Sequence, residues 1–205
     1  MTAEAKVKFF DGIADKWDGW EDLDAVAEKL ALGLDALGVA PDEAVLDVGC
    51  GTGNLTLALL QKLSQRGRVV AIDISVEMIR RAREKVADPR VDWHVCDAAR
   101  VPIDDRAVDR VICCSVWPHF DDPGAAIEEL RRVLRPRGAL HVWHLSPRAT
   151  INEIHASAGE AVAGDVLVPA AETARLLEQH GLDPYEVIDD ETGYLVSARR
   201  PPDHR

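Results

Sequence analysis

The chain has 205 residues, of which 47% are hydrophobic and 29% are charged, a composition typical of one globular domain and not of a disordered chain. Its 24 basic and 36 acidic residues give a formal net charge of −12. This charge disfavours nucleic acids and anionic membrane surfaces as partners, because both are polyanions. Small molecules and proteins remain as partners, and the sequence leaves a homodimer open.

Neither a membrane segment nor a metal site is expected. The longest uncharged, apolar-leaning run, near residues 111–120, is too short to span a bilayer. The first residues, 1–6, lack the apolar segment of a secretory signal, so we expect a cytoplasmic protein with reduced thiols. None of the four cysteines forms a C-x-x-C pair, which argues against zinc. Burial beside a sheet is the simpler interpretation of these cysteines, although Cys113 and Cys114 leave a thiol nucleophile or a soft-metal acceptor site open.

Hydrophobic spacing predicts the elements in chain order. Apolar residues at helical spacing predict helices up to about residue 39. Short apolar runs then predict strands at 44–48, 69–72, 91–96, 108–114 and 139–145. Helices are expected near 55–63, 75–86 and 122–135, with Ser75 and Asp122 as caps. Strands that alternate with helices indicate a parallel sheet covered on both faces.

The last part of the chain departs from this alternation. A helix is expected over residues 169–180, and two short apolar runs follow, at 185–188 and 194–198. The turn residues between these runs predict a β-hairpin. A parallel sheet that ends in a hairpin is not the pattern of a plain dinucleotide-binding domain.

The most informative motif follows the first strand, where Gly49-Cys-Gly-Thr-Gly53 leads into a helix. Glycines let the backbone approach a ligand closely, and ligands of open α/β sheets bind at the carboxyl ends of the strands. The G-x-G-x-x-G fingerprint of nicotinamide dinucleotides is incomplete, since Asn54 stands where its third glycine falls. Asp47, two residues before the loop, would oppose a pyrophosphate but suits a cationic ligand.

Two further acids end the next two strands. Asp73 stands where a carboxylate accepts hydrogen bonds from ribose hydroxyls, and Asp97 is placed to accept one from an adenine amino group. With Asp47, three acids therefore belong to three consecutive strands around one glycine loop. The ligand they describe is a nucleoside that carries positive charge and no pyrophosphate, as S-adenosylmethionine does.

At these motifs the chain resembles the class I S-adenosylmethionine-dependent methyltransferases, over about residues 9–198. The resemblance rests on five segments, at 47–53, 73–78, 96–99, 117–123 and 132–138. The last two segments, and Phe9 to Asp18, are similar to ubiquinone/menaquinone-type methyltransferases. This implies a Rossmann-like, doubly wound α/β sheet of seven strands with the last strand antiparallel. It also implies one domain, with a helical lid at 1–40, a cofactor core at 41–145, and an acceptor-side segment and hairpin at 146–205.

The resemblance also implies roles for particular residues. The cofactor-binding residues would be Trp17, Asp47, Gly49, Cys50, Gly51, Gly53, Asn54, Asp73, Ile74, Met78, Asp97, Ala98, Ser115 and Val116. Trp17 would close over the cofactor, the glycines would pass beneath its methionine part, and Ser115 and Val116 would line the sulfonium side. Three departures, namely Pro118, Arg137 and a segment at 146–168 that aligns with no known acceptor site, put a quinone substrate in doubt and leave the cofactor unaffected.

Histidines after the fourth and fifth strands are the candidates for acceptor chemistry. His119 and His144 are predicted to be catalytic, because a base is needed whenever the methyl acceptor must lose a proton. Asn152 and His155 would join His144 in a polar pocket if residues 151 onward are helical; structural histidines are the alternative. The predicted function is methyl transfer from S-adenosylmethionine to a small molecule, which releases S-adenosylhomocysteine. A non-catalytic S-adenosylmethionine-binding protein and a nicotinamide-dependent oxidoreductase are the alternatives.

Overall fold

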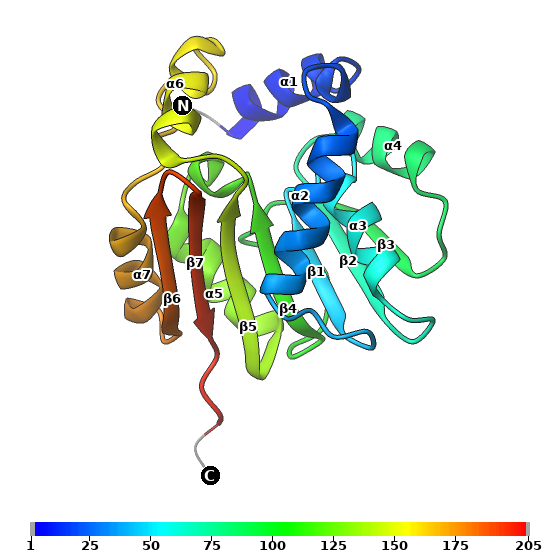
Figure 1. Ribbon diagram of the computed structural model, residues 1–205, viewed down its shortest axis with the longest axis vertical. Helices are drawn as coiled ribbons and strands as arrows, with labels where there is room; N and C mark the ends of the chain where they lie inside the picture. Colours follow the sequence, from blue (N-terminus) through cyan, green and yellow to red (C-terminus); the bar gives the residue numbers. More distant parts are fainter. Residues whose placement is uncertain (1–2, 204–205) are drawn as a thin grey trace.

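The computed structural model describes residues 3–203, so residues 1, 2, 204 and 205 of the expected domain lie outside the described part. Seven strands form one sheet in the order β3-β2-β1-β4-β5-β7-β6 (Figure 1). The strands are β1 (Ala44–Val48), β2 (Arg68–Asp73), β3 (Val91–Val95), β4 (Val108–Cys114), β5 (Leu134–His144), β6 (Asp183–Asp190) and β7 (Gly193–Arg199). β7 runs antiparallel to both its neighbours, and the other pairs are parallel. The predicted α/β sheet with an antiparallel last strand is confirmed.

Helices connect the strands and begin at the expected caps. They are α1 (Ala3–Ile13), α2 (Leu23–Ala36), α3 (Asn54–Lys62), α4 (Val76–Lys85), α5 (Pro123–Val133), α6 (Arg148–Ser157) and α7 (Ala170–Gln179), with 3-10 turns η1 (Trp17–Gly19) and η2 (Trp117–His119). Ser75 Oγ accepts a hydrogen bond from Met78 N at 3.0 Å, and Asp122 Oδ1 accepts one from Ala125 N at 3.0 Å. Each cap therefore satisfies a backbone N–H that the first helical turn leaves free.

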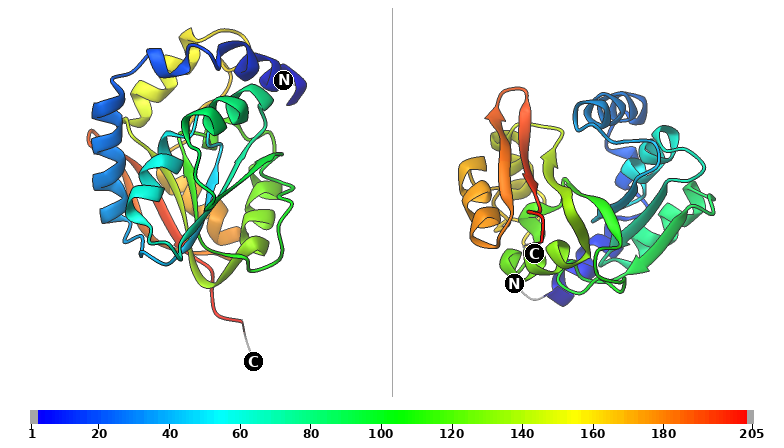
Figure 2. Two further views of the ribbon diagram at one scale, coloured as in Figure 1. Left: turned by 90° about the vertical axis from the view of Figure 1, so that its right-hand side faces the viewer. Right: turned by 90° about the horizontal axis from the view of Figure 1, so that it is seen from below.

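Two apolar layers enclose the sheet. One packs α5 and α7 against it and includes Leu46, Leu130 and Leu177. The other packs α2, α3 and α4 against the opposite face and includes Leu34 and Leu59. Figure 2 shows these helices on the two faces, while α1 and α6 lie across the carboxyl ends of the parallel strands (Figure 1). The parallel strands thus present their carboxyl ends to a space that α1 and α6 cover.

β5 begins at Leu134, five residues before the expected start. Val108 of β4 pairs with Leu134, and the register then shifts before Arg110 pairs with Ala139. Pro136, expected to end a helix, lies inside this irregular stretch of strand, where a missing backbone N–H is tolerated. α5 therefore stops at Val133, two residues earlier than predicted.

A buried polar network joins four strands on the face that carries α2. Arg110 Nη1 lies 2.6 Å from His141 Nε2, so this nitrogen is the acceptor. His141 Nδ1 then donates to Ser197 Oγ at 2.9 Å, and the Ser197 hydroxyl donates to Glu186 Oε2 at 3.2 Å. Burial, followed by the charge of Arg110, lowers the pKa of His141 to about 3, so the ring is neutral at physiological pH. Arg110 also pairs with Glu43 and donates to two carbonyl oxygens just after α2.

Candidate cofactor and acceptor site

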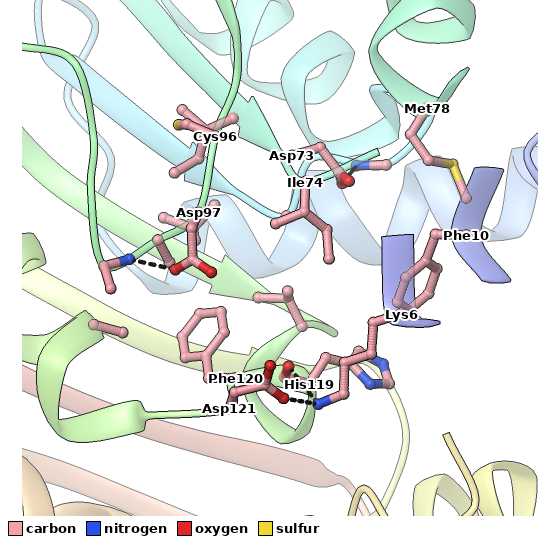
Figure 3. Close-up of a pocket in the computed structure, with 18 of the residues that line it drawn as sticks. Lys6, Phe10, Asp73, Ile74, Met78, Cys96, Asp97, His119, Phe120 and Asp121 are labelled. Atoms are coloured by element: carbon pink, nitrogen blue, oxygen red, sulfur yellow. Dashed lines mark hydrogen bonds and ion pairs between the residues drawn. The ribbon is translucent and has the colours of Figure 1, made fainter. Parts of the chain in front are cut away.

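A cavity of about 210 Å³ lies at the carboxyl ends of the parallel strands, beneath α1 and η1 (Figure 3). We call α1 and η1 the lid. Eleven of the predicted site residues line the cavity: Trp17, Gly49, Gly51, Asp73, Ile74, Met78, Asp97, Ala98, Ser115, Val116 and His119. Lys6, Phe10, Phe120 and Asp121 line it as well, although the sequence did not single them out for a site. The cavity therefore has a cofactor end, at the glycine loop and strand ends, and an acceptor end, at Lys6 and His119.

The glycine loop lines the cavity with backbone. Gly49 and Gly51 have φ angles of +65° and +53°, which glycine adopts readily and other residues rarely do. A Cβ at Gly49 would overlap the Val116 side chain. A Cβ at Gly51 would meet only Trp17 Nε1, at 3.9 Å, and would occupy the cavity. Both positions thus keep side-chain atoms out of the space where a ligand lies.

Ser115, between β4 and η2, is the third backbone feature at this end of the cavity. Its φ is +56°, in the left-handed region that non-glycine residues seldom occupy. Its N–H donates to Trp143 O at 2.8 Å, which holds the segment to β5. Strained residues of this kind concentrate where structure is shaped for a ligand.

Asp73 is the acid best placed for a ligand with hydroxyl groups. Gly51 N donates to its Oδ2 and Ser75 N donates to its Oδ1, each at 2.9 Å. Burial raises the pKa of Asp73, and these two N–H groups oppose the effect. Each carboxylate oxygen keeps a second lone pair, so the group is oriented by the backbone and still accepts bonds from a ribose.

Asp97 and its neighbours form the next part of the wall. Ala99 N donates to Asp97 Oδ1 at 2.7 Å, and the carboxylate is otherwise exposed. Ala98, Ile74 and Met78 contribute apolar surface beside it. An apolar slot with one carboxylate at its rim suits the flat ring and amino group of adenine.

Four predicted cofactor residues do not line the cavity. Asp47 is fully buried beneath the loop and accepts a hydrogen bond from Thr56 Oγ1 at 2.6 Å. Burial raises its pKa to about 7. Cys50 is buried and donates its N–H to a β2 carbonyl, Gly53 begins α3 with a φ of +87°, and Asn54 bonds to the lid. These four therefore lie away from the cavity, where they support the loop and the start of α3.

Acidic residues fasten the lid to the cofactor end. Asp11 Oδ1 accepts hydrogen bonds from Ser75 Oγ at 2.5 Å and from Glu77 N at 3.2 Å, so α1 is joined to the start of α4. Asp18 accepts a hydrogen bond from Thr52 Oγ1 at 2.6 Å and pairs with Lys85 at 2.5 Å, so η1 is joined to the glycine loop. These contacts hold Trp17 and Phe10 over the cavity.

Lys6 connects three segments of the chain at the acceptor end. Its side chain is 5% exposed, and Nζ pairs with Asp121 at 2.8 Å and with Asp165 at 3.1 Å. The same Nζ donates to the His119 carbonyl at 2.8 Å (Figure 3). Lys6 comes from α1, Asp121 follows η2, and Asp165 comes from the loop between α6 and α7. Three distant segments therefore meet at one ammonium group.

His119 and His155 meet beside this ammonium group. His119 Nδ1 lies 2.7 Å from Asp165 Oδ2, and His155 Nδ1 lies 2.6 Å from the Asp165 carbonyl oxygen. The two rings are 4.7 Å apart between centroids. Asn152 does not join them, because its amide exchanges hydrogen bonds with the backbone of Leu167. The predicted pocket of His144, Asn152 and His155 is wrong in this respect, since Asn152 fixes the following loop.

His144 is not part of the cavity wall. It is 1% exposed at the end of β5 and packs edge-to-face against Tyr194, with ring centroids 5.5 Å apart. Neither ring nitrogen has a hydrogen-bond partner among residues 3–203. Burial lowers its pKa to about 3, and the charges of His119 and His155 act in the same direction. The ring is thus neutral and separated from the cavity by packing.

The charges around the cavity favour a cationic nucleoside over a nucleotide with a pyrophosphate. Of its lining residues, Lys6 is the one cation other than histidine, and Asp121 and Asp165 already neutralise it. Asp73 and Asp97 at the cofactor end face no Lys or Arg in the lining. Such a site suits a cationic nucleoside and opposes a pyrophosphate.

Comparisons with known proteins agree with this geometry. The family model described as "Methyltransferase domain" matches residues 45–138, which hold β1, the glycine loop, Asp73 and Asp97. The ubiquinone/menaquinone biosynthesis C-methyltransferase of Hydrogenovibrio crunogenus is 30% identical over 159 residues, which are 71% of this chain and 62% of that protein. The chain is therefore similar to the class I S-adenosylmethionine-dependent methyltransferases.

Other methyltransferases extend the match. The trans-aconitate 2-methyltransferase of Azoarcus is 36% identical over 129 residues, 62% of this chain and 49% of that protein. A methyltransferase structure from Aquifex aeolicus has a TM-score of 0.75 and 24% identity, and the match covers 91% of this chain and 97% of that one. A Haloferax volcanii methyltransferase, solved with the Trm112 methyltransferase activator, also has a TM-score of 0.75, at 22% identity, and covers 95% and 98%. These structures show a shared fold.

The chain matches only part of each of the curated relatives that match first. It spans about a third to three-fifths of the length of those that match first. No helix in residues 3–203 is long and apolar enough to cross a membrane. Within the same residues, no three His, Cys, Asp or Glu side chains are grouped to hold a metal ion.

S-adenosylmethionine is the cofactor of this family, and the residues present fit it. The space above Gly51 would be filled by a Cβ, Asp73 keeps lone pairs for hydroxyl donors, and Ile74, Met78 and Ala98 offer an apolar slot. These residues would hold the methionine part, the ribose and the adenine in that order. The fit to S-adenosylmethionine therefore depends on the glycine loop and on the segments that follow β2 and β3.

Proposed function

We propose that the protein transfers a methyl group from S-adenosylmethionine to a small-molecule acceptor. The observation that carries this proposal is the Asp73 carboxylate, oriented by Gly51 N and Ser75 N at the edge of a cavity with no free cation. When bound, S-adenosylmethionine supplies an electrophilic methyl group, whose carbon–sulfur bond breaks as the acceptor atom bonds to carbon. Asp73 and Asp97 would bind the ribose and adenine, and the lid would exclude water.

The shape of the acceptor end is an argument for a small methyl acceptor. Phe10 and Trp17 cover the cavity from the lid, and Lys6 joins α1 to the opposite side. The cavity beneath this cover has a volume of about 210 Å³, which suits a small molecule better than a polymer. The net charge of −12 also disfavours a nucleic acid. Proximity and orientation under this cover supply much of the rate enhancement that an in-line displacement needs.

A particular observation also favours a role for His119. It lines the cavity at the acceptor end, whereas His144 is buried behind it. We therefore assign any proton transfer from the acceptor to His119. His144 would act only through packing against Tyr194. Replacement of His119 by Gln is expected to lower turnover and leave S-adenosylhomocysteine binding intact.

Titration calorimetry with S-adenosylhomocysteine tests the cofactor assignment. Asp73→Ala removes the ribose acceptor, so we expect the affinity to fall by about 1–3 kcal/mol. Asp104→Ala, which removes an exposed carboxylate away from the cavity, is the matched control and should bind as the wild type does. Binding of NADH in place of S-adenosylhomocysteine would reject the proposal. Release of S-adenosylhomocysteine with a panel of small acceptors distinguishes an enzyme from a binding protein.

A further inference from the structure

A histidine–carboxylate pair lies at the acceptor end of the cavity. His119 Nδ1 and Asp165 Oδ2 are 2.7 Å apart, and each side chain is 11% exposed. His119 comes from η2, directly after β4, and Asp165 comes from the loop between α6 and α7. The pair is therefore built by tertiary folding and not by a local motif.

The carboxylate determines which nitrogen of His119 carries the proton. Burial raises the pKa of Asp165, but hydrogen bonds from His119 and Lys6 outweigh burial and hold that pKa below its ordinary value. An ionised carboxylate only accepts hydrogen bonds, so His119 Nδ1 is the donor. In the neutral ring the lone pair then belongs to Nε2. Nε2 has no hydrogen-bond partner within residues 3–203, and the ring lines the cavity.

The groups around the pair keep it in place. Lys6 Nζ binds Asp165 Oδ1 at 3.1 Å and is shared with Asp121, so it offsets part of the negative charge of the two carboxylates. His155 donates its Nδ1 hydrogen to the Asp165 carbonyl, and burial lowers the pKa of His155, which makes it a neutral neighbour. Phe10 packs edge-to-face on the His119 ring, with centroids 5.2 Å apart. The carboxylate of Asp73 and the neutral ring of buried His144 also lie near His119.

From this geometry we infer that Asp165 is a positioning residue: it holds His119 with Nε2 unprotonated, so that His119 accepts a proton from the methyl acceptor. This inference rests on the proposed methyl transfer. The acceptor proton moves to Nε2, and the electron pair it leaves forms the bond to the methyl carbon. The carbon–sulfur bond breaks with its pair retained on sulfur, so no further reactant is needed.

The inference also defines a class of acceptor. A thioether or tertiary amine has no proton to lose and does not need such a base. A carboxylic acid is ionised at neutral pH and needs a free cation, whereas Lys6 is already bound by Asp121 and Asp165. An uncharged molecule with an ionisable hydroxyl group, such as a phenol or an enol, meets both conditions, and we infer that class for the acceptor. The methyl group then goes to that oxygen or to the carbon conjugated with it.

Nitrogen NMR of the histidine rings tests the tautomer directly. In protein labelled with ¹⁵N-histidine and bound to S-adenosylhomocysteine, His119 should show a protonated Nδ1 and an unprotonated Nε2, with His119→Gln used to assign the signals. Asp165→Asn leaves one carbonyl oxygen, which Lys6 Nζ keeps because an ammonium group can only donate, so the amide N–H faces His119 Nδ1 and the ring proton should move to Nε2. A wild-type ring protonated at Nε2, or an unchanged ring in Asp165→Asn, overturns the inference.

Asp121→Asn is the matched control, because Asp121 also pairs with Lys6 but does not touch the His119 ring. It should leave the tautomer unchanged; a change there would mean that Lys6 alone positions His119, which overturns the role of Asp165. Calorimetry on the same samples separates the two proposals. If the wild type fails to bind S-adenosylhomocysteine, the proposed function fails. If only Asp165→Asn fails to bind, Asp165 serves lid closure and the inference fails.

Turnover gives the last test. With a panel of phenols, enols and carboxylic acids as probes, S-adenosylhomocysteine release should occur with the first two groups. Asp165→Asn should lower kcat about 100-fold with little change in KM for S-adenosylmethionine, as loss of a general base does. Release with carboxylic acids alone, or a change confined to KM, contradicts the inference.

Discussion

The two ends of the cavity are built in different ways. The cofactor end is made by backbone groups and by side chains that directly follow β1, β2 and β3, such as Asp73 and Asp97. The acceptor end is made by side chains from α1, η2, α6 and the loop after α6, which meet at Lys6 and Asp165. The first end is therefore fixed by the sheet itself, and the second depends on how separate segments pack.

The largest effect is expected from a substitution in the glycine loop at the cofactor end. Gly49→Ala places a Cβ against Val116 at a φ of +65°, so both the overlap and the backbone conformation oppose it. We expect S-adenosylhomocysteine binding to be lost and the free energy of unfolding to fall by about 1–3 kcal/mol. Calorimetry and thermal unfolding measure the two effects.

Gly12→Ala in α1 is the control for this substitution. A Cβ there meets no atom within 4 Å, and alanine favours a helix. We expect unchanged binding and a stability that rises by up to about 1 kcal/mol. If both substitutions lowered binding and stability equally, the glycine loop would tolerate a side chain as well as α1 does. That result would contradict the difference between the two ends.

The next effect, on stability and not on binding, concerns the buried charge under the glycine loop. Burial raises the pKa of Asp47 to about 7, above its unfolded value near 3.9. The folded state thus binds more protons between these values, and stability falls as the pH rises from about 4 to 7. Each unit of raised pKa corresponds to about 1.4 kcal/mol.

Asp47→Asn keeps an acceptor for Thr56 Oγ1 and removes the charge. The stability of this variant should no longer fall with rising pH through this group. The difference between its free energy of unfolding and that of the wild type should therefore grow from pH 4 to pH 8. Urea unfolding at several pH values measures it, with exposed Asp104→Asn as the control. A pH dependence identical to that of the wild type would show that Asp47 stays ionised when it is buried.

The smallest effect concerns the contacts that join the lid to the loop. Asp18→Asn removes the charge that pairs with Lys85 at the side of the glycine loop. Because the pair is partly exposed, we expect S-adenosylhomocysteine affinity to fall by no more than about 1 kcal/mol, and less at high salt. Lys85→Met should cost about the same, and the double variant should be less than additive. Full additivity would mean that the two side chains act separately.

Local sequence was enough to predict the sheet and the cofactor end. Ala44–Val48 and Val108–Cys114 were predicted at their observed bounds, because a buried parallel strand is a short apolar run between turns. The Ser75 cap and the acid at the end of β2 follow from the same local rules. The placement of Gly49 and Gly51 on the cavity follows because glycines mark where backbone approaches a ligand.

The acceptor end was predictable only in part. His119 was identified from its position after β4, but Lys6 lies 113 residues before it and Asp165 lies 46 residues after it. Nothing in either local sequence shows that these side chains meet, because tertiary packing alone brings them together. His144 was expected at the acceptor end since it ends β5, yet its place in the strand directs it towards Tyr194. Side chains two residues apart in a strand face the same side of the sheet, so the apolar Val142 already indicated that His144 faces the core.

The buried network at Arg110 has a consequence for how the molecule opens. One guanidinium holds the end of α2 and, through His141 and Ser197, the hairpin of β6 and β7. To release either segment alone would leave buried donors unpaired, which costs more than the bonds themselves. Amide hydrogens of α2 and of β7 should therefore exchange with solvent together, in one global unfolding event. The lid, which is held by a few hydrogen bonds and by the ion pairs of Asp18 and Lys6, should exchange far earlier, so ligands enter and leave while the rest of the protein stays closed.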